Sequence, residues 1–218
     1  MMGAFLQQIW VARWALLDGA WLTVQISVLS IAAGTVFGVL VGLALTYGGR
    51  ALRWPARLFV DFIRGTPVLV LVLAAFYILS VIGIQLTAVQ AGIFALAVFC
   101  SSHVGEIVRG ALQAIPPGQT EAAKSLGLSF RQTVVLVLLP QALRQILPSW
   151  VNTGTEMVKA STLLSVIGVT ELLLATKEVI SRNYMSLQFY LLAAAIYFVV
   201  NFAIERLGKT LARRTALR

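Results

Sequence analysis

Charged residues are scarce in this chain of 218 residues: they make up 11% of it, whereas hydrophobic residues make up 59%. A soluble domain typically carries about 25% charged residues. The mean hydropathy of +0.90 agrees with this deficit. The composition therefore excludes an ordinary soluble domain and predicts one membrane-embedded domain spanning residues 1–218.

Catalytic motifs are also missing. The sequence has no Gly-x-x-x-x-Gly-Lys-Ser/Thr loop for nucleotide phosphates, and neither Gly-x-Ser-x-Gly nor His-Glu-x-x-His occurs. The only cysteine, Cys100, cannot form an intrachain disulfide and fits a small buried apolar position. The N-terminus lacks a basic region leading into a cleavable apolar core, so we expect no cleaved signal peptide. We expect a non-catalytic chain without a metal site.

Long apolar stretches dominate what is present. Five are long enough for spans or close to it, at about residues 20–47, 67–83, 91–111, 133–158 and 187–204. Residues 1–18, with two tryptophans four apart, suggest an amphipathic stub at the membrane interface. Residues 160–183 are too polar for a simple span, which predicts a short helix outside the hydrocarbon or a partly re-entrant segment. Gly34, Gly38 and Gly42 share one helical face, which we expect to pack against protein.

The basic residues indicate how the chain is oriented. They gather in the loop after the first apolar stretch, in residues 113–132 and in the tail. Because Lys and Arg concentrate in cytoplasmic loops, these segments should be cytoplasmic, with a periplasmic N-terminus and a cytoplasmic C-terminus. The same rule accounts for the net charge of +9, so we expect no nucleic-acid partner.

A polar island at residues 113–132 interrupts the apolar stretches. Pro116-Pro117-Gly118 predicts a turn, and residues 119–126 are mostly strong helix formers. Gly127 breaks this helix, and Ser129 can cap the next one. A short helix between two spans can protrude from the bilayer and be held by a partner, although an ordinary solvated loop is the simpler alternative.

These residues resemble the membrane subunits (permeases) of bacterial ABC importers, in the histidine/glutamine-type branch that moves polar amino acids. The signature of that family is Glu-Ala-Ala, three residues, Gly, nine residues, an aliphatic residue, one more and Leu-Pro. Here it reads Glu121-Ala122-Ala123, Gly127, Val137 and Leu139-Pro140, with valine where isoleucine is commoner. Further matching motifs lie at residues 62–67, 106–110 and 139–144.

The resemblance implies an all-α integral membrane protein of the bacterial inner membrane, with five transmembrane helices, a cytoplasmic coupling helix and the type I ABC importer permease fold. It implies half of a translocation pathway that works by alternating access, completed as a homodimer or as a heterodimer with a related permease. Two ATP-binding subunits would bind ATP and Mg, so this chain needs no cofactor. A periplasmic or tethered binding protein would deliver the amino acid. The residues that would couple to the ATPase are Glu121, Ala122, Ala123, Gly127 and Arg131.

Polar residues within the apolar stretches are candidates for the substrate path, because a buried charge usually faces a cavity or a partner. Asn152, Glu156 and Lys159 share one face by their spacing, and Ser161 follows. Glu156 could attract an α-ammonium and Lys159 an α-carboxylate, or the two could pair within the protein or reach water. His103 and Glu106 are a second candidate group.

Two features bear on this second group. Glu106 and Arg109 match the family's Glu-Ile-x-Arg-Gly pattern, so a structural ion pair supporting the coupling loop is an alternative to substrate contact. The His-x-x-Glu spacing of His103 and Glu106 also occurs in metal sites, but no second ligand cluster accompanies it.

Two other functions remain open from the sequence. A secondary transporter or channel for small polar solutes would also be apolar with buried charges, but usually shows internal repeats or more spans. A membrane-embedded enzyme would need a nucleophile–base pair or a metal cluster, which the sequence does not display.

Overall fold

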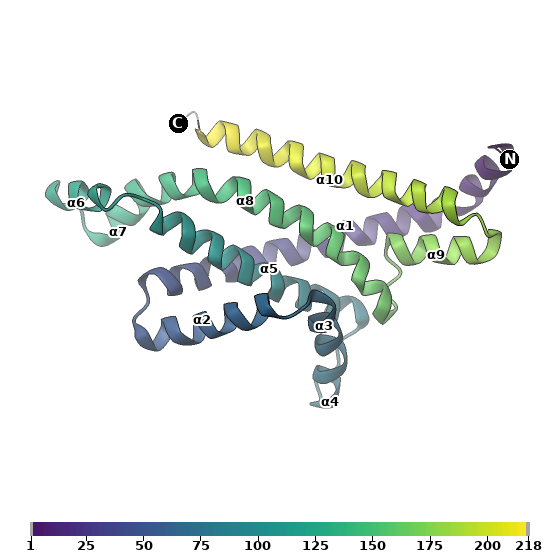
Figure 1. Ribbon diagram of the computed structural model, residues 1–218, viewed down its shortest axis with the longest axis horizontal. Helices are drawn as coiled ribbons and strands as arrows, with labels where there is room; N and C mark the ends of the chain where they lie inside the picture. The colour runs from purple at the N-terminus through teal and green to yellow at the C-terminus, as the bar shows by residue number, and fades with distance from the viewer. Residues whose placement is uncertain (1, 217–218) are drawn as a thin grey trace.

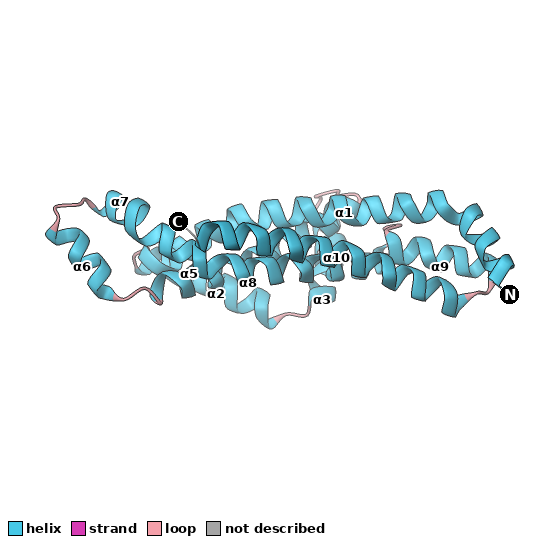
Figure 2. Cartoon of the chain, turned by 90° about the horizontal axis from the view of Figure 1, so that it is seen from above, coloured by secondary structure: helices cyan, strands magenta, loops and turns pink. Residues whose placement is uncertain are grey.

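The computed structural model describes residues 2–216, and over that range the chain consists of helices joined by short turns and loops, without a strand. The long helices lie side by side along one axis (Figures 1 and 2). The α-helices are α1 (Met2–Tyr47), α2 (Arg50–Gly65), α3 (Val68–Leu73), α4 (Leu79–Val81), α5 (Ala88–Gln113), α6 (Pro117–Ser125), α7 (Phe130–Gln132), α8 (Leu139–Ala160), α9 (Leu172–Asn183) and α10 (Ser186–Ala216). Two π-helical segments, η1 (Ala74–Ile78) and η2 (Thr133–Leu138), and the 3-10 helix η3 (Ser161–Ile167) join them.

The seam between α1 and α5 is the main contact of the bundle, and it is built on glycine. A β-carbon on Gly34 would lie 2.5 Å from the Cβ of Cys100, and one on Gly42 would lie 2.6 Å from the Cβ of Val108. Because glycine has no side chain at these positions, the two helices approach closely and gain van der Waals contacts. The prediction that the glycine face packs against protein is confirmed.

The N-terminal stub is not a separate element. Helix α1 runs without a break for 46 residues, which is about 69 Å at 1.5 Å per residue and well beyond a hydrocarbon core of roughly 30 Å. Residues 1–18 contain no proline to end a helix, so the stretch continues into the first span. The guanidinium of Arg13 lies 3.9 Å from the ring centroid of Trp10 on this extension.

The prediction of a loop after the first span is wrong, because residues 50–65 form the helix α2. This helix packs on α1 and α5, and its buried residues are Val60 and Ile63. The chain then bends by 109° into the segment of α3, η1 and α4 (Figure 1). The bend follows from Pro67, which forces Thr66 into an extended conformation (φ −102°, ψ 132°) and so ends α2. The second predicted span, residues 67–83, is therefore the second part of a bent pair whose first part is α2.

The remaining spans agree with the sequence. Within the described residues, four helical stretches are long and apolar enough to cross a membrane: Gly3–Tyr47, Ala88–Gln113, Phe130–Ile167 and Ser186–Thr210. The bent pair brings this number to five. The polar stretch 160–183 forms η3 and the short helix α9, as predicted. The turn between α1 and α2, helix α6 and the C-terminal part of α10 all lie toward one end (Figure 1).

Candidate functional site

Helix α6 stands at the far end of the bundle, between α5 and the long helix that contains α8 (Figures 1 and 2). Pro117 occupies its first turn, where a missing N–H costs nothing. Its other end closes on Gly127, which has φ +72°. The Leu128 N–H donates to the Ala123 carbonyl (3.1 Å) and the Gly127 N–H to the Lys124 carbonyl (2.9 Å). These two bonds form a Schellman cap, which needs a residue that tolerates the left-handed region.

The surface of α6 is open. Ala123 faces inward and is 2% exposed, whereas Glu121 and Ala122 are exposed. Glu121 and Arg131 form no ion pair with any of the side chains that the structure describes, residues 3–206 and 208–210. At the tip, Leu126 is 80% exposed. The outer face of α6 thus offers unpaired charge and apolar surface to another molecule.

The connection from α6 to the bundle is stiff on the α8 side. The Ser129 hydroxyl accepts from the Gln132 N–H, and the Gln132 side chain accepts from the Ser129 N–H (2.8 Å), which makes the predicted cap a full capping box. From there α7, η2 and α8 run on without a break. The Gln141 side chain also donates to the Gln119 side chain (3.1 Å), which ties α6 to α8 directly.

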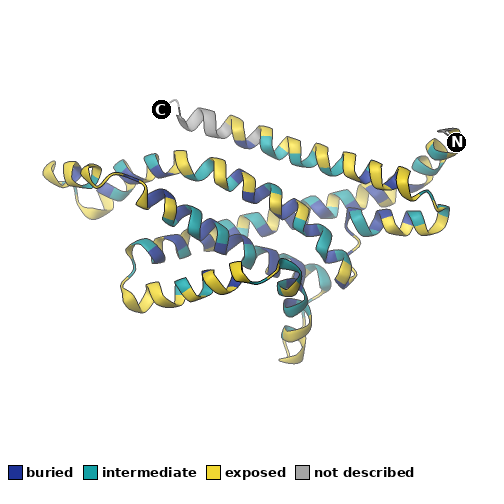
Figure 3. Cartoon of the chain, viewed as in Figure 1, coloured by how far each residue is buried: buried dark blue, intermediate teal, exposed yellow. Residues whose placement is uncertain are grey.

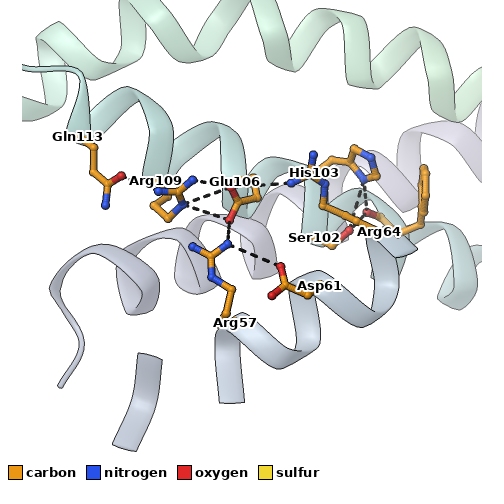
Figure 4. Close-up of polar contacts among 9 residues, drawn as sticks. Arg57, Asp61, Arg64, Ser102, His103, Glu106, Arg109 and Gln113 are labelled. Atoms are coloured by element: carbon orange, nitrogen blue, oxygen red, sulfur yellow. Dashed lines mark hydrogen bonds and ion pairs between the residues drawn. The ribbon is translucent and has the colours of Figure 1, made fainter. Parts of the chain in front are cut away.

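Glu106 is the centre of an arginine cluster between α2 and α5 (Figure 4). Its carboxylate accepts from the Arg109 Nε (3.1 and 3.2 Å) and from an Arg57 nitrogen (2.8 Å), and a nitrogen of Arg64 lies 3.8 Å away. The Glu106 side chain is 14% exposed. The predicted Glu106–Arg109 pair is present, but Arg57 and Arg64 are partners that sequence reasoning missed, because they come from another helix.

His103 does not join this cluster. Its ring lies 4.3 Å from the Phe99 ring, and its Nδ1 lies 3.0 Å from the Phe99 carbonyl oxygen. Among the residues described, no group of three or more His, Cys, Asp or Glu side chains is close enough to hold a metal ion.

The first candidate group for the substrate path lies on α8. Asn152, Glu156 and Lys159 are all exposed and share one face of the helix. Neither Glu156 nor Lys159 forms an ion pair within the described chain. Ser161 is fully buried, and its hydroxyl donates to the Val158 carbonyl (2.8 Å), so the structure separates it from that exposed face.

A buried carboxylate at the other end of the bundle was not predicted. Glu171 is 0% exposed and caps α9 by accepting from the Leu173 and Leu174 N–H groups (3.0 Å each). The Tyr197 hydroxyl of α10 also donates to it. The Leu172 N–H donates to the Thr23 hydroxyl of α1 (3.2 Å), so this corner ties three helices together. The only sequence signal is an acidic residue directly before a helix.

Known proteins similar to this chain fit this arrangement. The chain is 35% identical over 208 residues to the glutamine transport system permease protein GlnP of Escherichia coli K12, covering 94% of this chain and 95% of that protein. It is 38% identical over 184 residues to the probable amino-acid ABC transporter permease protein YckA of Bacillus subtilis, covering 84% and 81%. A crystal structure of an amino acid ABC transporter with histidines superposes with a TM-score of 0.88 at 33% identity, covering 96% and 98%.

A subunit of the methionine ABC transporter MetNI, in an inward-facing conformation, shares the fold at a TM-score of 0.79 and 24% identity. The fold is thus that of a type I ABC importer permease, a multi-pass membrane subunit. Residues 34–217 match the family described as the binding-protein-dependent transport system inner membrane component. The chain belongs to this family of inner-membrane transport components.

Proposed function

We propose that this chain is the transmembrane subunit of an ATP-driven amino acid importer. The proposal rests on helix α6, which lies outside the bundle. Its exposed Glu121 forms no ion pair within the described residues, and its Gln119 is hydrogen-bonded to Gln141 of α8. The similarity to amino-acid permeases over nearly the whole chain supports the substrate class.

Coupling follows from the connections of α6. A partner that pushes on its exposed face displaces a short helix whose C-terminal end is closed by the Schellman cap and whose first turn contains Pro117. The capping box and the Gln119–Gln141 bond pass this displacement to α8. Glu121 and Arg131 would contact the partner, Ala122 and Ala123 would allow close packing, and Gly127 would keep the bend.

The partners in this proposal are separate chains. Two ATPase subunits would dock below α6 and bind ATP and Mg, and a second permease copy or relative would complete the pathway. A periplasmic or tethered binding protein would deliver the amino acid from the other side. In this arrangement the end that carries α6 is cytoplasmic, the N-terminus is periplasmic and the C-terminus is cytoplasmic.

The polar face of α8 is our proposal for the substrate path. Asn152, Glu156 and Lys159 are exposed on the single chain, and charges at membrane depth are costly unless they face water, a solute or each other. Glu156 and Lys159 carry the two signs that a zwitterionic amino acid needs. Glu106 is already held by arginines and His103 lies against Phe99, so these two make weaker candidates.

Reversing the charge of Glu121 tests the coupling function. Glu121→Lys should lower ATP-dependent amino acid uptake in reconstituted vesicles by on the order of tenfold or more, because a like or unpaired charge in a protein contact costs several kcal/mol. Glu178→Lys is the matched control, since Glu178 is exposed on α9 at the opposite end. Unchanged uptake with Glu121→Lys would contradict the proposal, as would uptake without any ATPase subunit, which a secondary transporter or channel would show.

A further inference from the structure

The outer surface of α2 has a feature that the coupling function does not use. At 3.6 residues per turn, its four arginines, Arg50, Arg53, Arg57 and Arg64, fall within an arc of roughly 60°. This arginine ridge runs along the helix beside the buried side that packs on α1 and α5.

On the other side of the arginine ridge, α2 is apolar and uncovered. Trp54, Leu58 and Phe62 follow one another at intervals of four residues and are 75%, 62% and 66% exposed. In Figure 3 most of α2 is coloured as exposed. Large apolar side chains in such a row are uncommon on a surface that faces water.

The arginines of the ridge are used unequally. Arg57 and Arg64 approach the carboxylate of Glu106. Arg50 and Arg53 are exposed and meet no carboxylate among residues 2–216, and Arg53 bonds only to the Thr46 carbonyl at the end of α1 (3.3 Å). Arg50 and Arg53 at the start of α2 therefore hold positive charge that no carboxylate among the described residues neutralises.

We infer that α2 binds an anionic phospholipid of the cytoplasmic leaflet, with the phosphate at Arg50 and Arg53 and the acyl chains along Trp54, Leu58 and Phe62. Arginine clusters on amphipathic helices next to a span attract anionic headgroups, and tryptophan prefers the headgroup level. The charge is what selects this occupant, because a zwitterionic lipid would leave both arginines without a counter-ion. The choice of leaflet rests on the proposed function; the lipid contact does not.

Quenching of Trp54 by brominated lipids tests the inference. The full-length chain, with the subunits that co-purify with it, is reconstituted with brominated phosphatidylglycerol or brominated phosphatidylcholine in otherwise identical bilayers. Subtracting the signal of Trp54→Phe isolates Trp54 from the other four tryptophans. We expect brominated phosphatidylglycerol to quench Trp54 more strongly than brominated phosphatidylcholine does. In the double variant Arg50→Gln/Arg53→Gln, the affinity for phosphatidylglycerol relative to phosphatidylcholine should fall roughly fivefold for each arginine replaced.

Three comparisons keep the result decisive. Arg50→Lys/Arg53→Lys should retain most of the preference, and Lys177→Gln/Arg182→Gln, which removes two exposed charges from α9, should retain all of it. Raising the salt concentration should weaken the preference of the unaltered chain for phosphatidylglycerol. This comparison does not depend on whether any variant folds. Equal quenching by both lipids would overturn the inference. So would a preference that survives in the glutamine variant, or quenching by neither lipid, which would mean that protein covers Trp54. Quenching does not require ATP turnover, so it can be read even if the coupling test fails.

Discussion

Gly38 of α1 lies so close to Val104 of α5 that a β-carbon on the glycine would stand 2.6 Å from the Cβ of the valine. Real Cβ atoms do not approach one another this closely, so no side chain fits at this position without moving a helix. The same relationship holds one turn away on either side, at Gly34 and Gly42. The α1–α5 seam is consequently set by close contact of the α1 backbone with α5.

Replacing Gly38 by alanine should therefore destabilise the protein, although alanine is the better helix former. Overpacking of this kind costs about 1–3 kcal/mol, which exceeds the gain of about 1 kcal/mol in helix propensity. Thermal unfolding in detergent would measure the loss. Gly3→Ala on the same helix is the control: nothing lies within 4 Å of its β-carbon, so its stability should be unchanged or higher. Equal behaviour of the two variants would contradict the role of the seam.

The bond from Arg57 to Glu106 should be the main electrostatic link between α2 and α5. In a double-mutant cycle with Arg57→Ala and Glu106→Ala, we expect a coupling of roughly 1 kcal/mol, reduced from the value of a buried pair because the Arg57 side chain is 42% exposed. Chemical denaturation of the four proteins supplies the numbers. The exposed pair Glu205–Lys209 on α10 serves as the reference and should show no measurable coupling. An Arg57–Glu106 cycle that closes to zero would mean that Arg109 and Arg64 hold the carboxylate without Arg57.

What the sequence could predict was local. The glycine face, the break at Gly127 and the cap at Ser129 each depend on residues within a few positions of one another, and all three are present in the structure. The helix α2 was missed because its arginines are typical of a cytoplasmic loop. Pro67 marked only the start of the next apolar stretch, and the sequence did not show that the chain bends there.

The pairs that lie far apart in the sequence were beyond such reasoning. Arg57 and Glu106 are separated by 49 positions, and Glu171 and Tyr197 by 26. No periodicity links such residues, since their meeting depends on how whole helices pack. A single sequence therefore indicated which segments exist and which face of α1 is packed, but not which side chains join one helix to another.

The buried cap at Glu171 should be sensitive to loss of its charge. Three donors point at this carboxylate, from Leu173, Leu174 and Tyr197. In Glu171→Gln the amide N–H₂, a donor, would face N–H or O–H donors in place of an accepting oxygen. We expect a loss of about 1–3 kcal/mol in the free energy of unfolding. Tyr197→Phe removes a single donor and should cost less. Glu178→Gln, on the exposed side of α9, is the control and should leave stability unchanged. A neutral Glu171→Gln would show that the carboxylate does not fix α9.

The cap of α6 gives the last prediction, because Gly127 can be altered without touching any neighbour. Nothing lies within 4 Å of a β-carbon built there, so the cost of Gly127→Ala comes only from its left-handed φ of +72°. That cost is about 1 kcal/mol, and asparagine, which tolerates this region better, should cost less. Because the Leu128 N–H depends on the cap, its hydrogen exchange should speed up about fivefold in the alanine variant and less in the asparagine variant. Gly118→Ala, which also has open space but no left-handed backbone, should leave exchange unchanged. If exchange in α6 is the same in all three variants, the cap does not hold the helix end, and the stiffness that coupling through α6 requires must come from the capping box at Ser129 and the Gln119–Gln141 bond instead.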